Sequence, residues 1–132
     1  MCKQHKTWYV NDIPPNQKLY LACPYSDNDR QKREYRFERA NEEALLLMQQ
    51  GHIVFSPITH GHAIAQTATL EQREQVAMNH NFWMEQCVSF LTEWADAIVV
   101  LCLPGWQLSR GVTMEVEIAK EKGIPVYYIQ KS

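Results

Sequence analysis

Short apolar runs alternate with longer amphipathic segments along this chain. The apolar runs cover residues 18–23, 52–56, 96–103 and 124–129, and a proline directly follows each of the first three. Runs of this length that end in turn residues predict buried strands. The run over 96–103 (DAIVVLCL) is rich in β-branched residues and apolar on both faces, which is typical of a central strand in a parallel sheet.

Helices are predicted between these strands. They are a long charged helix after the N-cap residues 26–29, a helical region over 70–94 that breaks near 79–81, and a helix over 109–122. Gly51 ends the first helix and Gly123 caps the last one. Residues 57–67 are polar and contain a glycine, so we expect a loop there.

The resulting order of elements is β-α-β-α-β-α-β. It predicts an α/β fold in three layers, with right-handed crossovers and helices on both faces of an open, mainly parallel sheet of the flavodoxin-like or Rossmann-like kind. We expect one domain over residues 18–132, preceded by an N-terminal arm over 1–17. Ligands of such sheets bind at the carboxyl ends of the strands, so the loops over 24–29, 57–67 and 104–111 are the candidate site.

The amino-acid composition disfavours some classes of binding partner for this protein. The 132 residues carry 13 basic and 15 acidic side chains, a net charge of -2, so no overall positive field favours nucleic acid or an anionic membrane. The apolar run over 95–103 is far shorter than the roughly 20 residues that span a bilayer. The first sixteen residues lack the apolar core of a signal peptide. Cys2, Cys23, Cys87 and Cys102 form no CxxC motif, so we expect reduced thiols and a cytoplasmic protein.

The loop over 104–111 joins the central strand to the last helix. Its glycines would let a ligand approach the backbone, Ser109 could cap the helix or bind a phosphate, and Arg110 could supply positive charge. An ordinary strand-to-helix turn explains the same residues equally well.

Glu115 stands one turn inside that helix. It shares a face with Gly111 and Ala119, which directs its carboxylate toward the edge of the sheet, whereas Glu117 belongs to the solvent side. A carboxylate in this place suggests nucleophilic or acid/base chemistry. The alternative is an ion pair with Arg110 or a lysine.

Other polar and aromatic residues give weaker signals. His60 and His62 resemble a metal-binding pair, but no carboxylate stands at ligand spacing, so we predict hydrogen bonding and no metal or other cofactor. Among the arginines of the first helix, Arg36 is expected to be the most buried. Trp83 is expected in the core or a subunit contact, and Trp106 at the ligand.

Four segments of the sequence resemble the nucleoside 2-deoxyribosyltransferase superfamily, and within it a small bacterial and phage branch of unknown function. The segments are residues 19–26, residues 36–44, residues 51–58, and residues 95–119 with the pattern Ser109-x-Gly111-x-x-x-Glu115. The resemblance implies the same α/β fold and an N-glycosidase or deoxyribosyltransferase-like activity on a nucleoside or nucleoside 5'-monophosphate. Glu115 would attack the anomeric carbon, and the glycosyl-enzyme would pass the sugar to water or to another base.

The resemblance also implies a substrate site and an assembly. Ser109 and Gly111 match positions that hold the ribose or a 5'-phosphate, and Tyr25 matches the pocket for base and sugar. The expected substrate-binding residues are Cys23, Pro24, Tyr25, Ser26, Pro57, His60, His62, Cys87, Gly105, Trp106, Ser109 and Gly111. Related enzymes place a neighbouring subunit over the pocket, so a homodimer or homotetramer is expected.

One position departs from the superfamily pattern. Members usually carry an aspartate that protonates the leaving base where this chain has Cys87. A neutral thiol does not replace it, so protonation would need Glu85, His60 or His62, or a base that leaves unassisted. The same departure leaves a second hypothesis open, a catalytically silent nucleotide-binding or signalling module.

Overall fold

The computed structural model describes residues 12–130 as one sheet with helices on both sides. The sheet has the order β2-β1-β3-β4, and each neighbouring pair of strands is parallel. The strands are β1 (Lys18–Ala22), β2 (Ile53–Phe55), β3 (Ala97–Cys102) and β4 (Val126–Gln130). The predicted three-layer α/β fold is therefore confirmed, with the order that flavodoxin-like sheets have across their switch point.

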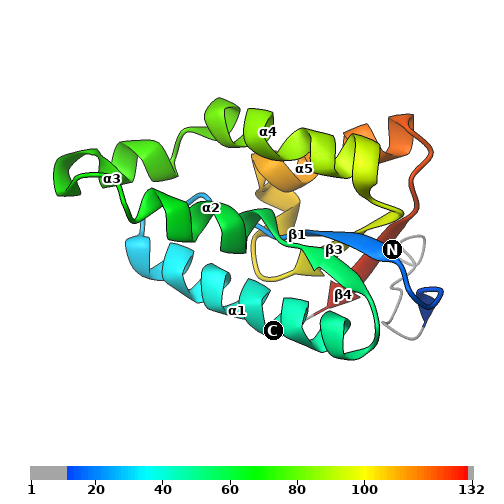
Figure 1. Cartoon of the computed structure of the whole chain (residues 1–132). Coiled ribbons are helices and arrows are strands. Elements are labelled where there is room, and N and C mark those ends of the chain that lie inside the picture. Colours follow the sequence, from blue (N-terminus) through cyan, green and yellow to red (C-terminus); the bar gives the residue numbers. More distant parts are fainter. Residues whose placement is uncertain (1–11, 131–132) are drawn as a thin grey trace.

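Helices connect the strands. They are α1 (Arg30–Gln49), α2 (Pro57–Ala65), α3 (Leu70–Ala77), α4 (His80–Ser89), the π-helical turn η3 (Phe90–Trp94), the 3-10 turn η4 (Trp106–Leu108) and α5 (Arg110–Glu121). In Figure 1, α1 lies below the sheet while α4 and α5 lie above it. None of the helices formed by residues 12–130 is both long and apolar enough to cross a membrane.

The two faces of the sheet carry separate cores. Leu19 and Leu21 of β1 pack toward α1, whereas Tyr20 and Ala22 pack toward α4 and α5, following the period of two along a strand. β3 is buried along its whole length, as its sequence predicts for a central strand. Ile13, from the predicted arm, packs into the core on the α1 side, while residues 1–11, and Cys2 with them, lie outside the described part of the chain.

The predicted loop over 57–67 is wrong, because most of it forms α2. The Ser56 hydroxyl accepts a hydrogen bond from the Thr59 amide at 3.2 Å, and Pro57 occupies the first turn, where a proline stabilises a helix. The polar residues obscured this helix in the sequence, although His62 and Ala65 point inward one turn apart. The break expected near residue 79 is confirmed, since the Asn79 side chain caps α4.

Two arginines of α1 tie neighbouring segments together. Arg33, and not Arg36 as predicted, is the most buried, at 2% exposure; it donates to the Asp27 carbonyl and to the Glu74 carboxylate of α3. Arg33 stands seven residues before Ala40 and so shares the face of α1 that packs on the core. Arg36 donates at 3.3 Å to the carbonyls of Tyr25, Ser26 and Pro104, which joins the loops after β1 and β3.

Candidate active site

A cavity of about 350 Å³ opens at the carboxyl ends of β1 and β3, where the chain connections leave the sheet in opposite directions. Its walls come from the loop after β1, from α2, from the α3–α4 region and from the start of α5. The predicted site residues that line it are Cys23, Tyr25, Ser26, Pro57, His62, Cys87, Ser109, Gly111 and Glu115. Four expected residues, Pro24, His60, Gly105 and Trp106, do not line it.

Glu115 is the buried carboxylate of this cavity. It is 7% exposed, and its Oε2 atom accepts a hydrogen bond from the Tyr20 hydroxyl at 2.6 Å. Burial raises the pKa of Glu115 to about 7, against the hydrogen bond from Tyr20, which lowers it. Among residues 12–130 no lysine or arginine pairs with Glu115, so the alternative ion pair is absent. Near neutral pH the side chain can therefore exist as a poorly solvated carboxylate facing the cavity.

Tyr20 is the partner that sequence reasoning did not single out. It lies fully buried in β1, on the face of the sheet that α5 covers. Side chains alternate along β1, so Tyr20 lies on the other face of the sheet from Leu19 and Leu21. A buried tyrosine on the face that α5 covers needs a hydrogen-bond partner for its hydroxyl there. The sequence therefore indicated that Tyr20 needs a polar partner, and the structure identifies this partner as Glu115.

Replacing Tyr20 with phenylalanine is expected to raise the pKa of Glu115, because the hydrogen bond stabilises the carboxylate. At pH 6 the ionised fraction of Glu115 should be roughly 10-fold lower in Tyr20→Phe than in wild type, and at pH 9 Glu115 should be ionised in both proteins. Titration of the Glu115 carboxyl group by nuclear magnetic resonance across this pH range tests the prediction. An unchanged or lower pKa of Glu115 in the variant would mean that the Tyr20 hydroxyl does not stabilise the carboxylate.

The start of α5 supplies polar atoms beside Glu115. The Ser109 hydroxyl accepts a hydrogen bond from the Val112 amide at 3.2 Å, so it caps the helix while its own proton stays available to a ligand. A Cβ atom added at Gly111 would meet nothing nearer than the Ser109 Oγ atom at 4.0 Å. Packing within the chain therefore does not require this glycine, and its bare backbone leaves room for a ligand.

Cys87 of α4 lines the cavity close to Glu115. Burial and the nearby Glu115 carboxylate raise the pKa of its thiol to about 12. The thiol is thus neutral in the physiological range and a very weak acid. It does not supply the proton that an aspartate would give at this position.

Trp83, and not Trp106, is the tryptophan of the cavity. The Trp83 ring packs over the backbone of Gly61, 3.3 Å from where a Cβ atom would stand, and its indole nitrogen donates to the Val76 carbonyl at 2.8 Å. Trp106 instead packs against Tyr128 on the sheet, with ring centroids 5.5 Å apart. The sequence placed Trp106 in a candidate loop, but η4 turns its side chain toward the core.

Several apolar lining residues were also missed. They are Ile58, Ala65, Ala77, Met78, Met84 and Leu108. Most belong to helices, where apolar residues predict core packing, and only their position over the ends of β1 and β3 turns them into cavity walls. His80 lines the cavity as well, and burial together with the nearby Arg110 lowers its pKa.

Comparison with known proteins places the chain in a family. A family model described as a domain of unknown function, DUF1937, matches residues 17–131. The chain belongs to the DUF1937 family. The match to this family spans β1 through β4 and therefore every residue that lines the cavity.

The fold of this DUF1937 domain is similar to that of a solved enzyme. The enzyme is the 2-deoxyribosyltransferase from the psychrotolerant bacterium Bacillus psychrosaccharolyticus, at a TM-score of 0.58 and 20% sequence identity. The similarity covers 86% of this chain and 72% of the enzyme. The sequences of the curated proteins gave no match. At this identity the comparison establishes the shared α/β fold.

Proposed function

We propose that this DUF1937 domain cleaves the N-glycosidic bond of a nucleoside or nucleoside 5'-monophosphate through a covalent glycosyl intermediate on Glu115. The observation that carries the proposal is the buried Glu115 carboxylate, held by Tyr20 at the wall of a cavity where ligands of such sheets bind. The fold similarity to a 2-deoxyribosyltransferase supports it, as does the Ser109-x-Gly111-x-x-x-Glu115 pattern. We place the chain in the small bacterial and phage branch of that superfamily.

The reaction takes two displacements at the anomeric carbon. A carboxylate oxygen of Glu115 forms a bond to that carbon while the bond to the base nitrogen breaks and its electron pair leaves with the base. Water or a second base then attacks the same carbon from the face opposite Glu115, gives up a proton to solvent, and releases the Glu115 carboxylate. With water as the acceptor the enzyme is a hydrolase, and with a second base it is a transferase. Both reactions use the same nucleophile. Neither step requires a metal or a cofactor.

The size of the cavity favours a small substrate. At about 350 Å³ it lies near the lower end of the roughly 300 to 1,000 Å³ found for small-molecule sites. Ser26, Ser109 and Arg110 offer hydrogen bonds and positive charge for a sugar or a 5'-phosphate, next to the N-terminus of α5. Ile58 and Trp83 offer apolar surface for the base.

We also propose that a second copy of the chain covers the mouth of the cavity, in a homodimer or homotetramer. Leu108 lines the cavity yet is 90% exposed, and the 43% exposed ring of Phe82 packs edge-on against Trp83, which also lines the cavity. Large exposed apolar side chains of this kind favour burial by another subunit. Sedimentation of wild type beside Leu108→Ser tests this, since the variant should dissociate more readily.

The direct test is release of free base from ribo- and deoxyribonucleosides and their 5'-monophosphates, followed by liquid chromatography. Mass spectrometry of protein quenched during turnover should find one pentosyl group, attached to the peptide that contains Glu115. Base release with no such adduct, or with the adduct on another residue, would contradict the covalent role of Glu115.

A catalytically silent nucleotide-binding module is the second candidate. The observation that favours it is Cys87, because among residues 12–130 no carboxylic acid besides Glu115 lines the cavity to protonate the leaving base. A nucleotide that raises the melting temperature while no compound of the panel loses its base would establish this alternative. Saturation at 100 times the dissociation constant should stabilise the fold by about 2.7 kcal/mol.

A further inference from the structure

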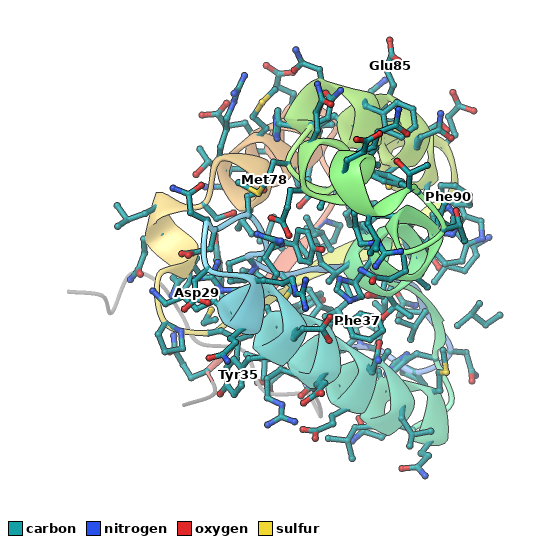
Figure 2. The ribbon with its side chains drawn as sticks, turned by 90° about the vertical axis from the view of Figure 1, so that its left-hand side faces the viewer. Asp29, Tyr35, Phe37, Met78, Glu85 and Phe90 are labelled. Atoms are coloured by element: carbon teal, nitrogen blue, oxygen red, sulfur yellow. The ribbon has the colours of Figure 1, made fainter. Side chains whose placement is uncertain are left out.

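The cleavage proposed above needs an acid for the leaving base, and few groups qualify. Glu85 is exposed and points away from the molecule on the outer side of α4 (Figure 2). His60 is exposed and does not line the cavity, where its ring would have to be. His80 lines the cavity, but burial and the nearby Arg110 lower its pKa, which disfavours the proton-donating imidazolium form. His62 is the candidate from the sequence that both lines the cavity and is buried.

His62 is the middle of a hydrogen-bonded chain of three side chains. Its Nδ1 atom lies 2.7 Å from the Tyr25 hydroxyl, and its Nε2 atom lies 3.1 Å from the Oε2 atom of Glu34. The three residues come from the loop after β1, from α2 and from α1. Tyr25 also lines the cavity, whereas Glu34 does not. These three hydrogen-bonded side chains therefore connect the cavity with the outer surface of α1.

Packing fixes the His62 ring in this position. The ring is 6% exposed and stacks on Phe37 of α1, with centroids 4.1 Å apart and planes 28° from parallel. Tyr25 meets it edge-on, with centroids 5.7 Å apart. Phe37 lies on α1 one turn after Glu34, so a single helix supplies both the stacking surface and the carboxylate. A histidine whose two ring nitrogens each have a different, fixed partner is suited to passing a proton from one partner to the other.

We infer that Tyr25, His62 and Glu34 form a proton relay that protonates the leaving base. This inference rests on the proposed N-glycosidic cleavage. In the reactive state the imidazolium of His62 donates from Nε2 to the Glu34 carboxylate and from Nδ1 to the Tyr25 oxygen. The Tyr25 hydroxyl then donates to a ring nitrogen of the base.

Two proton transfers accompany the cleavage, and each proton has a defined donor and acceptor. As the bond between sugar and base breaks, the Tyr25 proton moves to the base nitrogen, and the Nδ1 proton of His62 moves to the Tyr25 oxygen. Tyr25 ends unchanged, His62 ends neutral, and the base leaves with one proton more. A phenol alone is a weak acid, but here the proton comes in net terms from an imidazolium, which is a far stronger one.

The charged groups around the relay suit this task. The Glu34 carboxylate lies 3.1 Å from the Nε2 atom of His62 and is half-exposed, so it connects the relay to solvent, from which the proton returns. The guanidinium of Arg33 and the carboxylate of Glu74 also face Tyr25, and their influences on the pKa of its phenol have opposite signs. Burial raises the pKa of Tyr25, so the hydroxyl keeps its proton until the base takes it. Within the relay, Tyr25 is thus the catalytic residue that touches the base, and Glu34 is a positioning residue that acts through His62.

The experiment uses two leaving groups. One is the best nucleoside of the substrate panel; the other is the same nucleoside alkylated on a ring nitrogen of the base, which is already cationic and leaves without protonation. Tyr25→Phe, His62→Gln and Glu34→Gln should each lower kcat on the first substrate, the first two by roughly 10²- to 10³-fold. On the cationic substrate each variant should stay within about threefold of wild type, because no acid is needed there. Glu85→Gln is the matched control and should change neither rate.

The pH profile gives a second readout. Because the relay must hold a proton to protonate the base, kcat of wild type on the neutral base should fall at alkaline pH, and this fall should be absent with the cationic base. Losses of equal size on both substrates would assign the three residues a structural role and overturn the relay. Unchanged rates on the neutral substrate would overturn it as well.

Failure of the proposed function itself gives a different result. Glu115→Gln should abolish cleavage of both substrates, because the nucleophile is needed whatever the leaving group. If Glu115→Gln cleaves the cationic substrate at the wild-type rate, the covalent mechanism is wrong, whatever the relay variants do.

Discussion

Glutamine at position 115 is expected to lower the rate of base release by about 10³-fold or more, the scale seen when an enzyme loses its nucleophile. The amide has the shape of the carboxyl group, and its oxygen can still accept the hydrogen bond from Tyr20. Its oxygen is a poor nucleophile, however, and forms no stable ester with the sugar. Nucleoside affinity should change little, because the cavity keeps its shape. Initial rates from chromatography and a Kd from calorimetry measure the two effects separately.

The control for this substitution is Glu117→Gln on the same helix. Glu117 is exposed and does not line the cavity, so this variant removes the same charge without touching the site. It should release base at the wild-type rate. A Glu115→Gln protein within about threefold of wild type would exclude Glu115 as the nucleophile.

The same substitution is expected to stabilise the fold at alkaline pH. The pKa of Glu115 is about 7 in the folded protein, against 4.5 for an ordinary glutamate. Between these values the unfolded chain releases a proton that the folded protein retains, so stability falls as pH rises, and the loss is complete above about pH 7. The corresponding cost for the wild-type protein is about 3 kcal/mol. Glutamine does not ionise and escapes this cost.

Thermal melts at pH 5 and pH 8 measure this effect. Between the two pH values, wild type should lose roughly 10 °C more in Tm than Glu115→Gln does. The comparison across pH cancels any constant effect of the new amide on packing. Glu117→Gln should follow wild type, since Glu117 is solvated in both states. If wild type and Glu115→Gln show the same pH dependence, Glu115 is not a buried ionisable group of the kind described.

The strands and the two long helices could be predicted because burial imposes a simple period on them. Residues 97–102 are apolar on both faces because β3 lies in the centre of the sheet, and the phase of α5 predicted that Glu115 faces inward. The helix α2 was missed because its inward residues include His62 and Gly61, which an apolar pattern does not register. Hydrophobic periodicity thus predicts a helix that packs against an apolar core, but it does not predict a helix that packs against a polar site.

Contacts across the site were beyond the sequence for a different reason. The hydrogen bond from Tyr20 to Glu115 and the one between Tyr25 and His62 join residues 95 and 37 positions apart. Glu34 is one of many charged residues of the long helix α1, and only the packing of α2 against α1 singles it out. Such pairs depend on tertiary geometry, whereas the position of Glu115 follows from the local phase of one helix.

Arg36 has a consequence for the kind of ligand that the cavity can accept. A single guanidinium donates to the carbonyls of Tyr25, Ser26 and Pro104 and so joins the loop after β1 to the loop after β3. Ser26 and Ser109 stand on these two loops and line the same cavity. A ligand that bonds to both serines must therefore match the spacing of the two loops that Arg36 joins.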